Sequence, residues 1–155
     1  MAQRSLSFGT LGFAMALVGC GTVKYGDKEA EAALKRLTPV SNKVSLYACR
    51  EPAAFVGAGA KATVIVANQP IGTLRPNNFA HVVLEPGAYE IYIRRESIGT
   101  SNSGVLKVDG KAGEVAIIWV GVVAAGFGGL TLDFFPTRAE AERCVKGAEY
   151  AVRAE

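Results

Sequence analysis

The stretch ATVIVANQPIGTL, residues 62–74, decides the fold class of this 155-residue chain. Its first half is rich in β-branched side chains, which favour extended strands. Asn68, Gln69 and Pro70 predict a turn, and residues 71–74 predict a short return strand. Two short extended segments on either side of a turn indicate a β-hairpin, so we expect the chain to be built from antiparallel strands.

Short extended segments continue on both sides of this hairpin. They are residues 44–49, 79–84, 88–94, 105–108 and 115–120. Most of them alternate apolar and polar side chains, as strands do when one face is buried. The pair Asp109-Gly110 predicts a further hairpin turn. Strands of this length at regular intervals are typical of an antiparallel β-sandwich, and we expect about seven or eight of them.

Residues 115–132 contain no charged side chain, and a run of this length is near the lower limit for a membrane-spanning helix. Gly121 and the glycines within residues 126–129 interrupt the run, and its first part is β-branched. Short strand-like segments separated by glycine favour two buried strands joined by a turn. A membrane-inserting segment is the alternative interpretation.

The beginning of the chain has the form of a signal peptide. Arg4 is followed by an uncharged run over residues 6–18, which is shorter than a bilayer span. The run ends in LVGC, residues 17–20, which resembles the lipobox of bacterial lipoproteins. The resemblance implies that residues 1–19 are removed and that Cys20 carries an acyl-chain anchor. An ordinary secretory signal is the alternative.

The same resemblance implies a location. Gly21, rather than an aspartate, follows the cysteine, and in double-membraned bacteria this implies the outer membrane, with the protein facing the periplasm. After the loss of Arg4 with the signal, 16 of the 17 basic residues remain against 14 acidic ones, so the net charge falls from +3 to about +2. This balance gives no support for a nucleic-acid partner.

Two helices are expected, one near each end of the mature chain. Asp27 predicts the N-cap of a helix over residues 27–37, and Thr137 begins a capping box for a C-terminal helix. We expect residues 20–42 to form a lipidated tether, whose helix spaces the domain from the membrane or packs on its edge. Residues 43–155 are expected to form one domain, with the second helix packed on the sandwich.

Cys49 and Cys144 remain once Cys20 is assigned to the lipid. An exported protein can form disulfides, and a bond between these two would close a loop of nearly the whole domain. Two buried free thiols are an equally acceptable alternative.

Residues 43–135 resemble a family of small bacterial envelope lipoproteins that carry a PEGA-like β-sandwich domain of unknown function. The resemblance rests on YACR at residues 47–50, on VIVANQPIGTL at residues 64–74 and on LEPGAY at residues 84–89. It implies a sandwich on a lipid anchor. It supplies no activity, cofactor, metal or catalytic residue.

The chain offers few groups for catalysis. His81 is its only histidine, which excludes metal sites built on several histidines, and we expect it to be a structural residue in a strand. The glycine- and serine-rich residues 99–104 do not match a nucleophile elbow. No pair of a nucleophile and a base emerges, so we expect a protein that is not an enzyme and needs no cofactor.

These patterns together predict a membrane-tethered, non-catalytic envelope lipoprotein that acts as a structural or protein-interaction module. Its partners would be the membrane, through Cys20, and another envelope protein. Tyrosine and arginine are frequent in interfaces, and the candidate interaction surface consists of Arg75, Phe79, Tyr89, Tyr92, Arg94 and Arg95. The alternatives are a small-ligand or glycan-binding module that uses the loops at residues 55–57 and 97–104, or a membrane-inserting component that uses residues 115–132.

Overall fold

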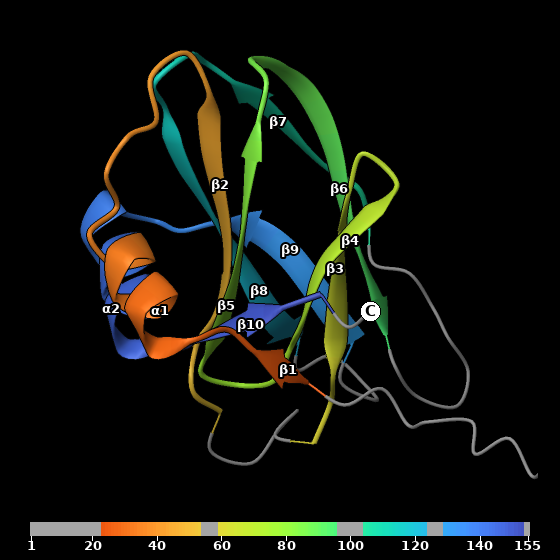
Figure 1. Cartoon of the computed structure of the whole chain (residues 1–155). Coiled ribbons are helices and arrows are strands. Elements are labelled where there is room, and N and C mark those ends of the chain that lie inside the picture. Colours follow the sequence, from red (N-terminus) through yellow and green to blue (C-terminus); the bar gives the residue numbers. More distant parts are fainter. Residues whose placement is uncertain (1–22, 54–58, 96–103, 124–128, 154–155) are drawn as a thin grey trace, which may run out of the picture.

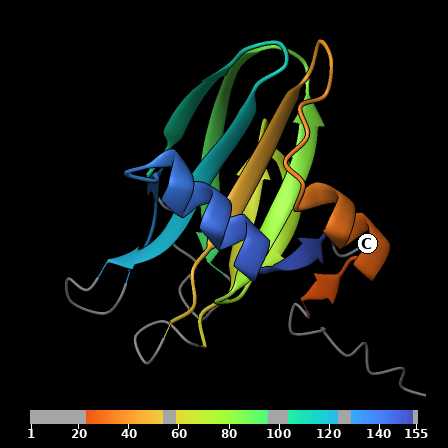
Figure 2. The same cartoon turned by 90° about the vertical axis from the view of Figure 1, so that its left-hand side faces the viewer.

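The structure is a computed structural model, and it describes residues 23–53, 59–95, 104–123 and 129–153. In these residues the chain forms ten strands in two stacked sheets and two helices (Figure 1). The helices cover the outer face of the larger sheet (Figure 2). The expectation of a mainly β fold is confirmed, and the two sheets are compatible with a sandwich, whereas the expected count of about seven or eight strands is too low.

The larger sheet contains six strands in the order β1-β10-β5-β2-β8-β9. The bounds of its strands are β1 Lys24–Tyr25, β2 Val44–Arg50, β5 Asn78–Leu84, β8 Val115–Val123, β9 Gly129–Phe134 and β10 Glu149–Val152. The smaller sheet has the order β4-β3-β6-β7. Its strands are β3 Ala62–Val66, β4 Gln69–Leu74, β6 Gly87–Arg95 and β7 Leu106–Gly110, and the helices are α1 Lys28–Leu34 and α2 Arg138–Gly147.

The hairpin expected over residues 62–74 is present as β3 and β4, and its turn is tighter than the sequence suggests. Ala67 and Asn68 both have a positive φ, 47° and 62°, as a two-residue type I′ turn requires. β4 therefore begins at Gln69 and includes Pro70. A proline is tolerated there because β4 is an edge strand, whose outer side has no ladder hydrogen bonds to lose.

Two strand pairs in the larger sheet are parallel, which corrects the expectation of a purely antiparallel sandwich. β2 pairs in this way with β8, and β5 with β10. Between β2 and β8 the chain passes through the smaller sheet, and just before β10 it runs over the larger sheet as α2. Neither pair is therefore joined by a hairpin, and such crossovers are what parallel pairing requires.

The hairpin turn expected at Asp109-Gly110 is wrong, because both residues lie within β7. β7 pairs with β6 in the smaller sheet, and the chain turns over residues 111–114 to enter β8 in the larger one. Gly110 faces Val44 across the two layers, where a Cβ atom on the glycine would lie 2.8 Å from Val44 Cγ2. A glycine is needed here because its backbone lies against the Val44 side chain, and not because the chain turns.

β2 lies at the centre of the larger sheet and is buried along its whole length. Val44, Leu46 and Ala48 belong to the core between the two sheets. Tyr47 and Cys49 point the other way and belong to a second core beneath the helices. A strand between two packed layers has no solvated face, so it is mainly apolar on both sides.

The uncharged residues 115–132 fall in β8 and β9, which pair antiparallel with Val120 opposite Leu132. Ile118 and Val120 are 0% and 1% exposed. The turn expected between the strands falls on residues 124–128, which lie outside the described residues. Within the described ranges, no helix is long and apolar enough to cross a bilayer. The two expected strands are therefore observed, and they form part of the core.

α1 is packed onto the domain. The Glu31 carboxylate accepts a hydrogen bond from the backbone N–H of Tyr150 in β10 at 3.0 Å, and Leu34 O accepts one from the Tyr47 hydroxyl at 3.1 Å. β1 also pairs with β10. Of the two roles expected for this helix, packing on the domain is the one observed, and the folded unit begins well upstream of residue 43.

The starts of both helices agree with the sequence. Asp27 accepts a hydrogen bond from Ala30 N, and Thr137 accepts one from Glu140 N, as N-cap side chains do. α2 ends at Gly147 and is followed by β10, a strand that the sequence did not predict. β10 is only a few residues long, so it carries too little periodicity to be recognised.

A disulfide joins Cys49 of β2 to Cys144 of α2, whose Cα atoms lie 6.2 Å apart. It is one of the two alternatives stated for these cysteines. The bond ties the helix to the central strand and closes a loop with a sequence separation of 95 residues. In the chain-entropy model, a loop of this size stabilises the folded state by about 4–5 kcal/mol.

Replacing both cysteines with alanine should lower the free energy of unfolding by about 2–5 kcal/mol, because the unfolded chain regains entropy. Urea denaturation with and without reductant measures the change. Reductant should lower the wild-type midpoint and leave that of the Cys49→Ala/Cys144→Ala variant unchanged. A wild-type midpoint that does not respond to reductant would contradict a stabilising disulfide.

Candidate functional site

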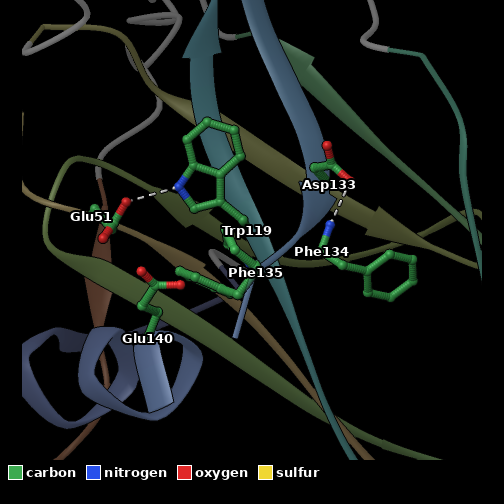
Figure 3. A pocket seen from close by; sticks show the side chains of 7 residues that line it. Glu51, Trp119, Asp133, Phe134, Phe135 and Glu140 are labelled. Carbon is green, nitrogen blue, oxygen red and sulfur yellow. Dashed lines mark hydrogen bonds between the residues drawn. The ribbon is translucent and has the colours of Figure 1, made fainter. Parts of the chain in front are cut away.

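A groove lies on the outer face of the larger sheet, beside the first turn of α2 (Figure 3). The cavity beside Trp119 has a volume of about 270 Å³. We call it the Trp119 groove, and the residues that line it are Glu51, Trp119, Asp133, Phe134, Phe135, Pro136 and Glu140. Two neighbouring cavities, of about 120 and 340 Å³, share Glu51 with it and extend it along β8 and along α2.

The alternation of side chains along β8 places Trp119 on the same face as Ile117 and Gly121. Ile117 lies in the core beneath the helices, whereas Trp119 is only partly covered. A Cβ atom on Gly121 would lie 2.1 Å from Cη2 of the indole. The ring therefore packs directly against the backbone of Gly121, and only a glycine leaves room for it.

Glu51 reaches Trp119 from the end of the neighbouring strand. Cys49 lies opposite Trp119 in the parallel pair of β2 and β8, so Glu51, two residues further on, extends past the ring on the same face. The indole Nε1–H donates a hydrogen bond to Glu51 Oε2 at 3.1 Å (Figure 3). This bond orients both the ring and the carboxylate.

α2 forms the opposite wall of the groove and is fixed to the sheet. Besides the disulfide through Cys144, Arg138 Nη1 donates a hydrogen bond to the backbone oxygen of Val115 at 2.6 Å. Glu140 Oε2 accepts a hydrogen bond from the Thr137 hydroxyl at 2.9 Å, which holds the Glu140 carboxylate at the rim. The two walls are thus held at a fixed separation.

Three carboxylates surround the groove: Glu51, Asp133 and Glu140. Asp133 accepts a hydrogen bond from the backbone N–H of Phe134 at 2.8 Å. In the described part of the chain, none of the three carboxylates forms an ion pair. Arg143 lines the adjoining cavity along α2 rather than the cavity beside Trp119. The cavity beside Trp119 therefore carries a negative charge beside aromatic rings.

The groove is suited to binding a ligand. Its described lining contains no histidine, serine or threonine, and the cysteine of the adjoining cavity is bonded in the disulfide. Its ionisable groups are carboxylates, which accept hydrogen bonds and attract cations. Among the described residues, no three potential metal ligands lie close enough to hold a metal ion. Aromatic rings beside carboxylates do, however, attract cations.

The candidate interaction surface expected from the sequence does not form one patch. Phe79 is 0% exposed, so its assignment to a surface is wrong. Its ring packs between those of Tyr150 and Tyr47, with centroids 5.3 Å and 6.1 Å away, beneath the helices. Arg75 is exposed in the turn before β5.

The remaining four residues of that expected surface lie on β6 and are divided between its two faces. Tyr89 and Arg95 lie on the same face of the strand as the buried Ile91 and Ile93, and Tyr89 packs against the core between the sheets. Tyr92 and Arg94 lie on the outer face of the smaller sheet. The loops at residues 55–57 and 97–103, and Cys20, lie outside the described residues. β6 therefore supplies two separate pairs rather than one surface.

His81 lies on β5 beside Tyr47, with ring centroids 4.5 Å apart. Its Nε2 atom is buried and has no hydrogen-bond partner among the described residues. Burial lowers the pKa of His81 from 6.5 to about 4, so the ring is neutral near pH 7.

No model of a known protein family matches the chain, and a search of curated proteins finds no match. The groove is therefore interpreted from its own geometry.

Sequence reasoning did not identify the groove. Trp119 is the only tryptophan of the chain, and Gly121 follows it on the same strand face, which is the one signal that could have been used. Glu51 lies 68 residues before Trp119, and no local pattern links the two. Their contact depends on the parallel pairing of β2 and β8, which the sequence did not predict.

Gly121→Ala should displace the indole of Trp119 and break its hydrogen bond to Glu51, because the new Cβ atom would overlap the ring. Since the chain has one tryptophan, its fluorescence emission reports the change directly. Gly129→Ala is the matched control, because a Cβ atom there meets nothing within 4 Å. Emission spectra that are identical for both variants and the wild type would disprove this packing.

The pKa of His81 predicts a loss of stability on acidification. The unfolded chain binds a proton at about pH 6.5 and the folded chain only near pH 4. Stability should therefore be unaffected above pH 6.5 and should fall between pH 6.5 and 4, by up to about 3 kcal/mol. Urea denaturation at several pH values measures this slope, and His81→Gln should flatten it.

Glu31 does not interfere in that range. Burial raises the pKa of Glu31, but hydrogen bonds from Lys35, the Tyr150 N–H and Lys28 outweigh this and lower the pKa from 4.5 to about 2. The stability that Glu31 contributes is therefore lost only as the pH falls from 4.5 toward 2. The same slope between pH 6.5 and 4.5 in wild type and His81→Gln would refute the role of His81.

Proposed function

We propose that this chain is a lipid-anchored, non-catalytic binding module of the bacterial envelope, which holds a basic side chain of another envelope protein in the Trp119 groove. The lipobox-like residues 17–20 support the anchor at Cys20, and the resemblance to small envelope lipoproteins supports an outer-membrane location facing the periplasm. Both remain parts of the proposal.

The arrangement of Glu51 is the observation that carries the proposal. Its carboxylate is oriented by the Trp119 indole, and it has no cationic partner in the part of the chain that the structure describes. A cation over an aromatic face gains about 0.5–2 kcal/mol, and a charge-assisted hydrogen bond to a fixed carboxylate adds to this. A lysine ammonium group meets both conditions, because it is a compact cation that can lie over the ring and donate to the carboxylate at the same time.

A sugar is the second candidate ligand. The rings of Trp119 and Phe135 line the same cavity as three carboxylates, and carboxylates accept hydrogen bonds from hydroxyl groups. A concave site with aromatic rings and a few converging polar groups is typical of small-ligand sites. Insertion of residues 115–132 into a membrane would require β8 and β9 to leave the core, so we do not propose it.

Carbodiimide crosslinking in intact envelopes tests the protein partner, because this reagent couples a carboxylate only to an amine that touches it. We expect the full-length protein to form a crosslinked product whose junction maps by mass spectrometry to Glu51, Asp133 or Glu140. Glu51→Gln and Trp119→Ala should each reduce this product several-fold. Glu29→Gln is the matched control, since Glu29 is an exposed carboxylate on α1.

A product of equal yield in all variants would contradict the groove as the contact site. If no product forms and the Trp119 emission instead changes on titration with soluble envelope glycan fragments, the sugar replaces the protein as the ligand. The emission of Gly121→Ala should then respond less than that of the wild type, because its ring is displaced.

A further inference from the structure

We propose that the β1 edge of the larger sheet rests on the membrane surface and that the Trp119 groove, across the same sheet, faces away from it. This inference rests on the proposed lipid at Cys20. The occupant of the β1 edge is the phospholipid surface into which that lipid is inserted. The argument depends on where the folded chain begins, on what holds β1 and α1 in place, and on the strand order.

The folded chain begins very close to the proposed anchor. β1 starts at Lys24, four residues after Cys20. An extended chain covers at most about 3.6 Å per residue, so the Cα atom of Lys24 lies within about 14 Å of that of Cys20. This is less than the distance of about 24 Å between the two edges of the six-stranded sheet, so the anchor cannot hold the domain far from the lipid surface.

Neither β1 nor α1 can act as a spacer, because both are fixed to β10. Lys24 lies opposite Val152 in the antiparallel pair, and the backbone N–H of Gly26 donates a hydrogen bond to Tyr150 O at 3.0 Å. The α1 residue Glu31 accepts a hydrogen bond from the Tyr150 N–H at 3.0 Å. β1 and α1 could extend the tether only if these hydrogen bonds broke. The folded domain therefore keeps the distance between Cys20 and the sheet short.

The side chains at the β1 edge suit an interfacial position. Tyr25 is 48% exposed, and a tyrosine ring with a polar hydroxyl is favoured at the level of lipid headgroups. Lys24 and Lys28 are accompanied by the exposed acidic residues Asp27 and Glu149, so the edge is not strongly basic. The contact should therefore depend on the anchor and on Tyr25 and should need no anionic lipid.

The strand order places the groove across the sheet from this edge. β1 is one edge strand and β9 is the other, and β8 is separated from β1 by β10, β5 and β2. Four steps of about 4.8 Å between neighbouring strands put β8 about 19 Å from β1. In Figure 2, β1 (red-orange) and β9 (light blue) lie on opposite sides of the domain. An anchor at β1 thus leaves the groove open to a partner in the periplasm.

Quenching of tryptophan by spin-labelled lipid tests the orientation. Lipidated full-length protein is reconstituted into phosphatidylcholine vesicles that contain nitroxide-headgroup phosphatidylcholine. In the wild type the only tryptophan, Trp119, reports the groove. In Tyr25→Trp/Trp119→Phe the only tryptophan reports the β1 edge. We expect quenching to be several-fold stronger at position 25 than at position 119, with no increase when anionic lipid is added.

A second variant tests whether the short tether to the anchor causes the quenching at position 25. A flexible glycine-serine segment of about 20 residues, inserted between Thr22 and Val23, should strongly reduce the quenching at position 25. Three outcomes would overturn the orientation, provided that the protein still binds the vesicles. They are equal quenching at both positions, stronger quenching at Trp119, and no effect of the insertion. Failure of the wild type to cosediment with vesicles better than Cys20→Ala would instead overturn the lipid anchor, and this inference with it.

Discussion

The burial of β2 on both faces is the constraint on which the rest of the structure depends. Leu46 packs toward the smaller sheet and Tyr47 toward the helices, so both layers must be present before the strand is fully covered. The chain meets this requirement by placing β8 parallel to β2 and α2 over both. The groove arises where this cover ends: Cys49 is bonded to the helix, and Glu51, two residues later, is exposed.

Local features of the fold could be predicted from the sequence, and features set by packing between layers could not. The hairpin of β3 and β4 and the cap at Thr137 follow from the backbone preferences of neighbouring residues. Asp109-Gly110 has the composition of a turn, yet Gly110 is required by its contact with Val44, which is 66 residues away in the chain and in the other sheet. A glycine has several physical uses, and its sequence context does not distinguish them.

The candidate site illustrates the same limit. The sequence predicts a surface position for Phe79 because aromatic residues are frequent in interfaces, but the helix that covers it comes from the far end of the chain. Trp119 and Glu51 were not recognised, because each is unremarkable in its own strand and they become a pair only through a parallel register. Single residues at the ends of strands gain a role from their neighbours in the folded chain, and these neighbours are not visible in one sequence.

The pairing of β1 with β10 brings together residues near the two ends of the described chain, since Lys24 lies opposite Val152. Pairing over so large a separation is slow, because the entropy of a long loop must be offset before the contact stabilises anything. If the chain is exported from its N-terminus, as proposed, residues 149–152 cross the membrane after the other described strands. β1 would stay unpaired until β10 had crossed. A stalled chain without β10 would then carry the proposed anchor beside an open sheet edge, where quality-control proteases and chaperones can recognise it.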